Sequence, residues 1–115
     1  MKSQSHSDDI LTRLVAKAVE LGAEGLDIEY QNRREEVCAV RGNMGFGIAS
    51  LDSSSVEAAT LRKQLGAIGK KGKNVTIAGT TYRLKVTTYD SFGETAFSVT
   101  IERGTNPQSP AVPKK

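Results

Sequence analysis

Cysteine, histidine, tryptophan and proline are all scarce or absent in this chain of 115 residues. The single cysteine, Cys38, cannot form an internal disulfide, and the single histidine, His6, lies near the N-terminus. Zinc sites need clustered ligands and an activated nucleophile needs a base beside it, so neither site is expected. Cys38 is therefore interpreted as a buried, unreactive strand residue. Asp27 and Glu29 could together bind a cation weakly, but a solvated sheet face explains them better.

Long apolar runs are also missing, which excludes a helix that spans a bilayer. The polar stretch from Met1 to Asp9 lacks the apolar core of a signal peptide. We therefore expect a cytoplasmic protein with no membrane insertion, and a lone thiol fits that compartment. With 37% hydrophobic and 25% charged residues, the composition is that of a globular chain with one core. Because aromatic residues make up only 5%, the core must be mainly aliphatic.

The distribution of serine and proline indicates where the folded part begins and ends. Residues 1–7 are rich in serine and are expected to form a disordered N-terminus. Residues 104–115 hold all three prolines and are expected to form a flexible tail. Residues 8–103 are predicted to be a single α+β domain. Its elements are expected in the order αβββ–αβββ, with two helices packed on an antiparallel sheet.

The first predicted helix rests on apolar residues that recur at helical spacing from Ile10 to Leu21. Ser7 or Asp8 is expected to cap its start, and Gly22 is a natural stop.

The second predicted helix follows Asp52. Ser54 and Glu57 have the spacing of a capping box, and Gly69 is expected to end the helix. Its apolar stripe comprises Ala58, Leu61, Leu65 and Ile68. A basic loop is expected at residues 70–73.

Six strands are predicted from short segments in which apolar and polar residues alternate. They are expected around residues 26–31, 35–41, 44–51, 75–78, 82–86 and 97–101. The dipeptide Gly42-Asn43 suggests a tight hairpin, and further turns are expected at residues 32–34, at Gly79 and at residues 90–93. Such short connections favour antiparallel pairing.

Two glycine-rich segments lack the features of a phosphate-binding loop. Residues 42–47 lie between strands, so a hairpin explains them better than a helix N-terminus would. In residues 66–74, Ala67 stands where the first glycine of a P-loop belongs and Asn74 stands where Ser or Thr belongs. This segment also follows a helix, whereas a P-loop precedes one. We therefore expect no catalysis, no cofactor, and neither tight binding nor hydrolysis of ATP.

Charge is distributed unevenly along the chain. Residues 1–60 hold six Lys/Arg against ten Asp/Glu, and residues 61–103 hold eight against three. The basic residues that could meet an anion or a partner are Arg62, Lys63, Lys70, Lys71, Lys73 and Lys85. No aromatic surface for stacking bases accompanies them, and lysines after a helix C-terminus also favour the helix dipole. Solvated surface charge is the alternative interpretation.

Residues 22–29, with the sequence G-A-E-G-L-D-I-E, resemble the G-A-S-D-I-H-I-E motif in the N-terminal domain of type II secretion and type IV pilus ATPases. In that family the motif also follows a helix and opens a strand. Residues 37–42 correspond to the family's R-x-R-x-D-G turn. Residues 72–88 resemble its G-R strand, its G-R-x turn and its L-R-V-S-T strand, and residues 91–94 resemble its V-x-G-E. The resemblance covers about residues 8–103 and implies a PAS-like α+β domain.

The chain departs from this family at functional positions. The two arginines of R-x-R correspond to Val37 and Ala39, and the arginine of L-R-V-S-T corresponds to Lys85. In the family, arginines of this domain reach toward nucleotide in the motor domain, and a lysine does not replace their forked geometry. The other departures are Glu24-Gly25 for Ser-Asp, Asp27 for His, and Arg41 for Asp. No Walker motif of the motor domain is present.

The resemblance implies a stand-alone relative of that domain, without the motor domain and without ATPase function. We expect a non-catalytic protein-interaction module, an adaptor or a regulator, whose partner is another protein, such as a secretion or pilus component. The alternative is a phosphate- or nucleic-acid-binding module that uses the basic cluster at residues 62–73.

Overall fold

The computed structural model of the protein describes residues 10–104 and has an α+β fold, as the sequence predicts. Its elements are α1 (Ile10–Glu20), β1 (Gly25–Gln31), β2 (Arg34–Arg41), β3 (Met44–Asp52), α2 (Val56–Ile68), the 3-10 helix η2 (Gly69–Lys71), β4 (Lys73–Ile77), β5 (Thr80–Ser91) and β6 (Glu94–Arg103). The expected disordered N-terminus, the cap of α1 at Ser7 or Asp8, and the tail beyond Gly104 lie outside the described residues. No helix within residues 10–104 is long and apolar enough to cross a membrane.

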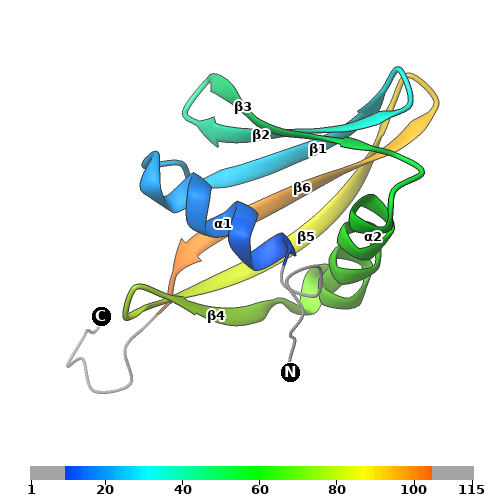
Figure 1. The fold of residues 1–115 in the computed structure, drawn as a ribbon. Helices are drawn as coiled ribbons and strands as arrows, with labels where there is room; N and C mark the ends of the chain where they lie inside the picture. Colours follow the sequence, from blue (N-terminus) through cyan, green and yellow to red (C-terminus); the bar gives the residue numbers. More distant parts are fainter. Residues whose placement is uncertain (1–9, 105–115) are drawn as a thin grey trace.

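The six strands form one antiparallel sheet in the order β3-β2-β1-β6-β5-β4. Each half of the chain contributes three strands joined by tight turns, and the central pair β1–β6 joins the two halves (Figure 1). Gly25 permits the close approach of these two strands. A Cβ atom at this position would lie 2.6 Å from the carbonyl oxygen of Val99, which is closer than real Cβ atoms approach.

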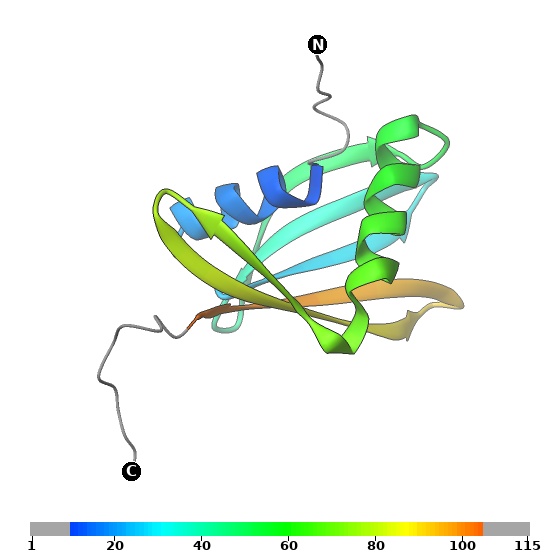
Figure 2. The same cartoon turned by 90° about the horizontal axis from the view of Figure 1, so that it is seen from below.

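Both helices cover the same face of the sheet (Figure 2), because the strands alternate apolar and polar side chains along their length. The side chains that fill the space between the layers are almost entirely aliphatic, as the composition predicts. The core comprises Ile10, Leu11, Leu14, Val15, Ala18, Leu26, Ile28, Val37, Ala39, Leu61, Leu65, Ile68, Leu84, Val86, Val99 and Ile101. The opposite face of the sheet, here named the open face, carries no helix of the part of the chain that the structure describes.

Three of the hairpins turn through two residues that both have positive φ, the geometry of a type I′ turn. They are Asn32-Arg33, Ala78-Gly79 and Phe92-Gly93. Asn and Gly adopt this conformation readily, whereas Ala and Phe do so at a cost in free energy. The fourth hairpin has Gly42 first in its loop at φ 60°. The expected hairpin at Gly42-Asn43 is therefore confirmed.

The predicted cap of α2 is wrong by one residue. Ser55, and not Ser54, is the N-cap, because its hydroxyl oxygen accepts a hydrogen bond from the backbone N–H of Ala58 at 3.0 Å. Ser54 instead donates its N–H and its hydroxyl to Asp52, at 2.9 and 2.7 Å. These two bonds hold the pKa of the Asp52 carboxyl below its usual range. Ser54 therefore stabilises the turn before α2, and Ser55 is the residue that caps the helix.

The expected basic loop at residues 70–73 is also wrong. Lys70 and Lys71 belong to η2, and Lys73 already opens β4. Gly72 allows this abrupt change of direction, because its φ of 87° is unfavourable for other residues.

Cys38 is half-buried on the open face and is not part of the core, contrary to the expectation from sequence. Alternation along β2 decides this, since Val37 and Ala39 are fully buried on the helix side and Cys38 lies between them. The same alternation places Glu35 on the helix side, where only 5% of it is exposed.

The capping assignment predicts different effects for two neighbouring serines. Ser55→Ala should lower the free energy of unfolding by about 1 kcal/mol, because it removes the acceptor for the N–H of Ala58. Ser54→Ala is the matched control and should have a smaller effect, because it leaves the cap in place. Urea denaturation of both variants measures the difference. A larger loss for Ser54→Ala would contradict the assignment.

Candidate functional site

Three connections meet at one end of the sheet, which we name the tip. The tip comprises the β1–β2 turn at Asn32-Arg33, the β3–α2 loop at residues 53–55 and the β5–β6 turn at Phe92-Gly93 (Figure 1). The N–H of Ser53 donates to the carbonyl oxygen of Arg33 at 2.9 Å, which fixes the loop against the first turn. The tip is therefore built from parts of the chain that are far apart in sequence.

Phe92 is the most exposed large apolar residue among those that the structure describes, with 99% of its surface accessible. It also has φ 53°, a left-handed conformation that is costly for a bulky residue. Neither feature stabilises an isolated domain, because the ring buries nothing and the backbone is unfavourable. Phenylalanine is therefore an unusual residue for this position, which asparagine and alanine occupy in the other two turns of this type.

Residues that follow the Phe92-Gly93 turn help to line a hollow of about 370 Å³, which we name the tip hollow. Its lining residues come from three strands (β1, β2 and β6), the β3–α2 loop and α2, and they are Tyr30, Glu35, Ser53, Arg62, Glu94, Thr95 and Phe97. Tyr30 and Phe97 are half-buried and give the hollow two aromatic walls. Glu94 follows the Phe92-Gly93 turn directly, so the exposed ring and the hollow are neighbours in the chain.

An ion pair between Glu35 and Arg62 lies in the tip hollow. Arg62 Nη1 donates to Glu35 Oε2 at 2.9 Å, and Arg62 Nη2 donates to the carbonyl oxygen of Ser53 at 3.2 Å. A carboxylate as buried as that of Glu35 needs a partner, because an unpaired charge in the interior is very unfavourable. Arg62 therefore connects α2 to β2 and to the loop before α2, and its guanidinium is not free for a phosphate.

The other basic residues predicted to bind an anion or a partner do not form one cluster with Arg62. Lys63 is exposed on α2, Lys70 and Lys71 lie in η2 beyond the other end of α2, and Lys73 begins β4. Lys85 pairs with Thr100 on β6 and lies on the open face, because its neighbour Leu84 points into the core. The structure therefore brings together only the three lysines at 70, 71 and 73.

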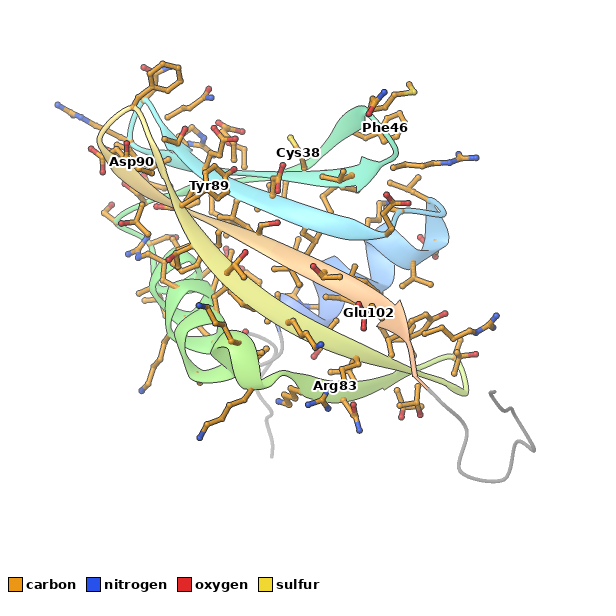
Figure 3. The ribbon with its side chains drawn as sticks, turned by 180° about the vertical axis from the view of Figure 1, so that it is seen from behind. Cys38, Phe46, Arg83, Tyr89, Asp90 and Glu102 are labelled. Atoms are coloured by element: carbon orange, nitrogen blue, oxygen red, sulfur yellow. The ribbon has the colours of Figure 1, made fainter. Side chains whose placement is uncertain are left out.

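The open face carries a row of side chains that crosses four strands. Tyr89 on β5 lies opposite Ala96 on β6, and Glu29 on β1 lies opposite Glu36 on β2. The hydroxyl of Tyr89 donates to Glu29 at 3.1 Å, and the hydroxyl of Ser91 donates to the other carboxylate oxygen at 3.1 Å. These bonds reach from β5 to β1 across β6, and the small, fully buried Ala96 leaves the room for them. Figure 3 views the sheet from this side.

Carboxylates set the electrostatics of the open face. Burial raises the pKa of Asp27, and repulsion from Glu29 raises it further, while a hydrogen bond with Ser98 opposes the shift. Burial likewise raises the pKa of the Cys38 thiol, and nearby carboxylates, Asp27 first among them, add to it. Burial is also the largest cause that raises the pKa of Tyr89 to about 12. The open face is thus acidic at its centre, which disfavours a polyanion there.

Among the described residues, the tip and the open face offer surfaces for contact with another molecule. Within residues 10–104 no three histidine, cysteine or acidic side chains come close enough together to hold a metal ion. Sequence reasoning missed Phe92 and Glu35 as notable residues. A signal existed for both, because Phe92 precedes a glycine in a predicted turn and Glu35 is in phase with the buried Val37.

The ion pair predicts a large effect at Arg62 and a small one at its neighbour. Arg62→Ala should lower the free energy of unfolding by about 2 kcal/mol, because it leaves the buried carboxylate of Glu35 without a partner. The side chain of Arg62 is 39% exposed, which keeps the loss below that of a fully buried pair. Lys63→Ala is the control and should change stability by less than about 0.5 kcal/mol. Equal effects in urea denaturation would contradict a structural role for Arg62.

The burial of Cys38 and the carboxylates near it predict that its thiol is alkylated slowly. At pH 8, iodoacetamide should modify the native protein more slowly than the urea-unfolded chain, because burial and then the nearby carboxylates raise the pKa of the thiol and leave little thiolate. Asp27→Asn should speed the native reaction, because the loss of a negative charge lowers the pKa of the thiol. Glu102→Gln, on the same face but not among the groups that raise this pKa, should not. Equally fast labelling of native and unfolded chains would show that Cys38 is accessible and ionised.

A scan against protein-family models finds no family that matches this chain, and a search of the curated proteins finds no significant match. The function must therefore be inferred from the geometry of the site.

Proposed function

We propose that this chain is a non-catalytic protein-interaction module and that Phe92 at the tip is its main contact residue. The observation that supports the proposal is the combination of 99% exposure with a left-handed backbone at an aromatic residue. Both features are unfavourable in the free protein and become useful when a partner covers the ring. Burial of a phenylalanine side chain contributes about 2 kcal/mol to an association, which is enough to make Phe92 an anchor.

The tip hollow gives the proposed partner a second point of contact. Its volume of about 370 Å³ is sufficient for a side chain of the partner, and its half-buried aromatic walls provide apolar area. Arg62 and Glu35 already satisfy one another, so the pair contributes polar orientation without an unpaired charge. The proposed surface therefore has an apolar anchor beside a polar pocket, which is how protein interfaces are commonly organised.

An adaptor or regulatory role follows from the proposed surface. We further propose that the chain is a PAS-like, cytoplasmic relative of the N-terminal domains of secretion and pilus ATPases, on the strength of the motifs at residues 22–29 and 72–94. On that proposal the partner is a component of a secretion or pilus system. Nucleic acid is the weaker candidate, because Arg62 is paired and Lys85 lies on a different face from the remaining lysines.

Two asparagine substitutions separate contact from folding. Phe92→Asn should raise the free energy of unfolding by about 1 kcal/mol, because asparagine tolerates the left-handed conformation that phenylalanine does not. Ala78→Asn is the matched control, since Ala78 occupies the same position of the same type of turn at the other end of β5. It should stabilise the fold as well. Urea denaturation measures both variants.

Only Phe92→Asn should weaken binding, by about 30-fold, which corresponds to about 2 kcal/mol of lost burial. A photo-crosslinking amino acid at position 92, and another at position 78 as a control, would capture the partner in cells. The captured protein is then purified and titrated against the wild-type chain and both variants. Equal affinity of the Phe92→Asn variant, or no captured protein specific to position 92, would overturn the proposal.

A further inference from the structure

Within residues 10–104, the strand β4 lies at the end of the sheet order and pairs only with β5. The two-residue turn Ala78-Gly79 is closed by the pair Ile77–Thr80, which is a hydrogen-bonded pair in such hairpins. Because hydrogen-bonded and non-hydrogen-bonded pairs alternate in an antiparallel ladder, Asn74 and Thr76 are the residues whose backbone groups point away from β5. No other strand of the described residues lies beside these N–H and C=O groups, so they form an edge that another strand can join.

The opposite edge of the sheet is less suited to such pairing. Its strand, β3, contains a register shift opposite Val37 and Cys38, and bulges of this kind interrupt the regular row of edge groups. The register of β4 with β5 is continuous from Lys73 to Ile77. A regular template for strand addition therefore exists at β4 and not at β3.

A second hollow, which we name the edge pocket, lies beside β4 on the helix side. It has a volume of about 290 Å³ and is lined by Leu11, Thr12, Gln64, Ala67, Ile68, Gly72, Lys73, Val75 and Leu84. Lys73 and Val75 are alternate residues of β4, so their side chains lie on the same face of the strand and line the edge pocket together. An added strand would place its own alternate side chains next to them. Its backbone would bond to the edge while one side chain fills the edge pocket.

We propose that β4 and the edge pocket form a binding site for an extended peptide segment of another protein, with an apolar residue for the pocket and acidic residues on either side. Acidic residues in the peptide are favoured by three lysines at the pocket. Lys73 lines the pocket, and Lys70 and Lys71 are exposed just before Lys73 in the chain. A second copy of this chain fits less well, since it would bring both sets of lysines to one edge. This site lies beyond the proposed function at the tip and does not depend on it.

The site can be tested with random heptapeptides displayed on phage and selected against the purified full-length chain. Enriched peptides should alternate apolar and acidic residues, and the best of them is then synthesised and titrated. Ala67→Leu fills the edge pocket and should weaken binding of this peptide by about tenfold. Ala59→Leu is the matched control, because Ala59 is also an exposed alanine of α2 but does not line the pocket. It should leave affinity unchanged.

The backbone contribution is tested at Thr76. Thr76→Pro removes an edge donor, and proline is tolerated on an edge strand whose N–H faces outward. It should reduce affinity for the peptide by about tenfold or more. Slow amide exchange at Val75 and Ile77 would show that the β4–β5 hairpin of the variant is still formed. In the wild-type chain, bound peptide should slow exchange at the amides of Asn74 and Thr76.

The proposal is overturned if no peptide is enriched, or if its affinity is insensitive to both Ala67→Leu and Thr76→Pro. Protection that maps to β3 or to the open face would overturn it as well. If the free protein dimerises with rising concentration and already protects Asn74 and Thr76, the occupant is a second copy and the proposal is wrong. Phe92→Asn should leave the affinity for the peptide unchanged, so the proposal for the tip and the proposal for the β4 edge are tested independently.

Discussion

The pairing of β1 with β6 is the contact on which the rest of the structure depends. These strands come from opposite ends of the folded chain, and each half forms its own three-stranded meander around them. Without this pair the two meanders would be separate small sheets with little core between them. Gly25 makes the pairing possible, because any side chain there would collide with the backbone of Val99. The absence of a Cβ atom at this one position thus allows the two meanders to form a single sheet.

Once β1 and β6 have paired, the alternation of side chains along each strand determines which residues lie on which face of the sheet. The helix side collects the aliphatic side chains, together with Glu35, whose charge is then matched by Arg62 from α2. On the open face, burial is the largest cause that raises the pKa of Cys38 and of Tyr89, and the nearby carboxylates of Asp27 and Glu29 raise both further. The burial of the aliphatic residues on the helix side and the grouping of carboxylates on the open face both follow from the same strand register.

The proposed contact surfaces lie at places where the fold leaves groups unsatisfied. Phe92 is apolar and exposed at a turn, and no other strand within residues 10–104 pairs with the outer side of β4. The two places are at different ends of α2, since the tip adjoins its first turn and the edge pocket adjoins its last. Together, the two proposed surfaces would let the chain bind two different segments at once.

Several features of the protein follow from the sequence alone. The aliphatic core, the α+β class, the two helices and the hairpins depend on local periodicity and on turn residues, which operate over a few positions. Helical spacing from Ile10 and the Gly42-Asn43 turn are examples, and the structure contains both. The tertiary structure alone decided which residues meet. It placed Cys38 on the open face, paired Arg62 with Glu35, and left Lys85 apart from the other lysines. Each of these outcomes depends on strand register and on which side of the sheet the helices cover, and both are set by contacts between residues distant in sequence.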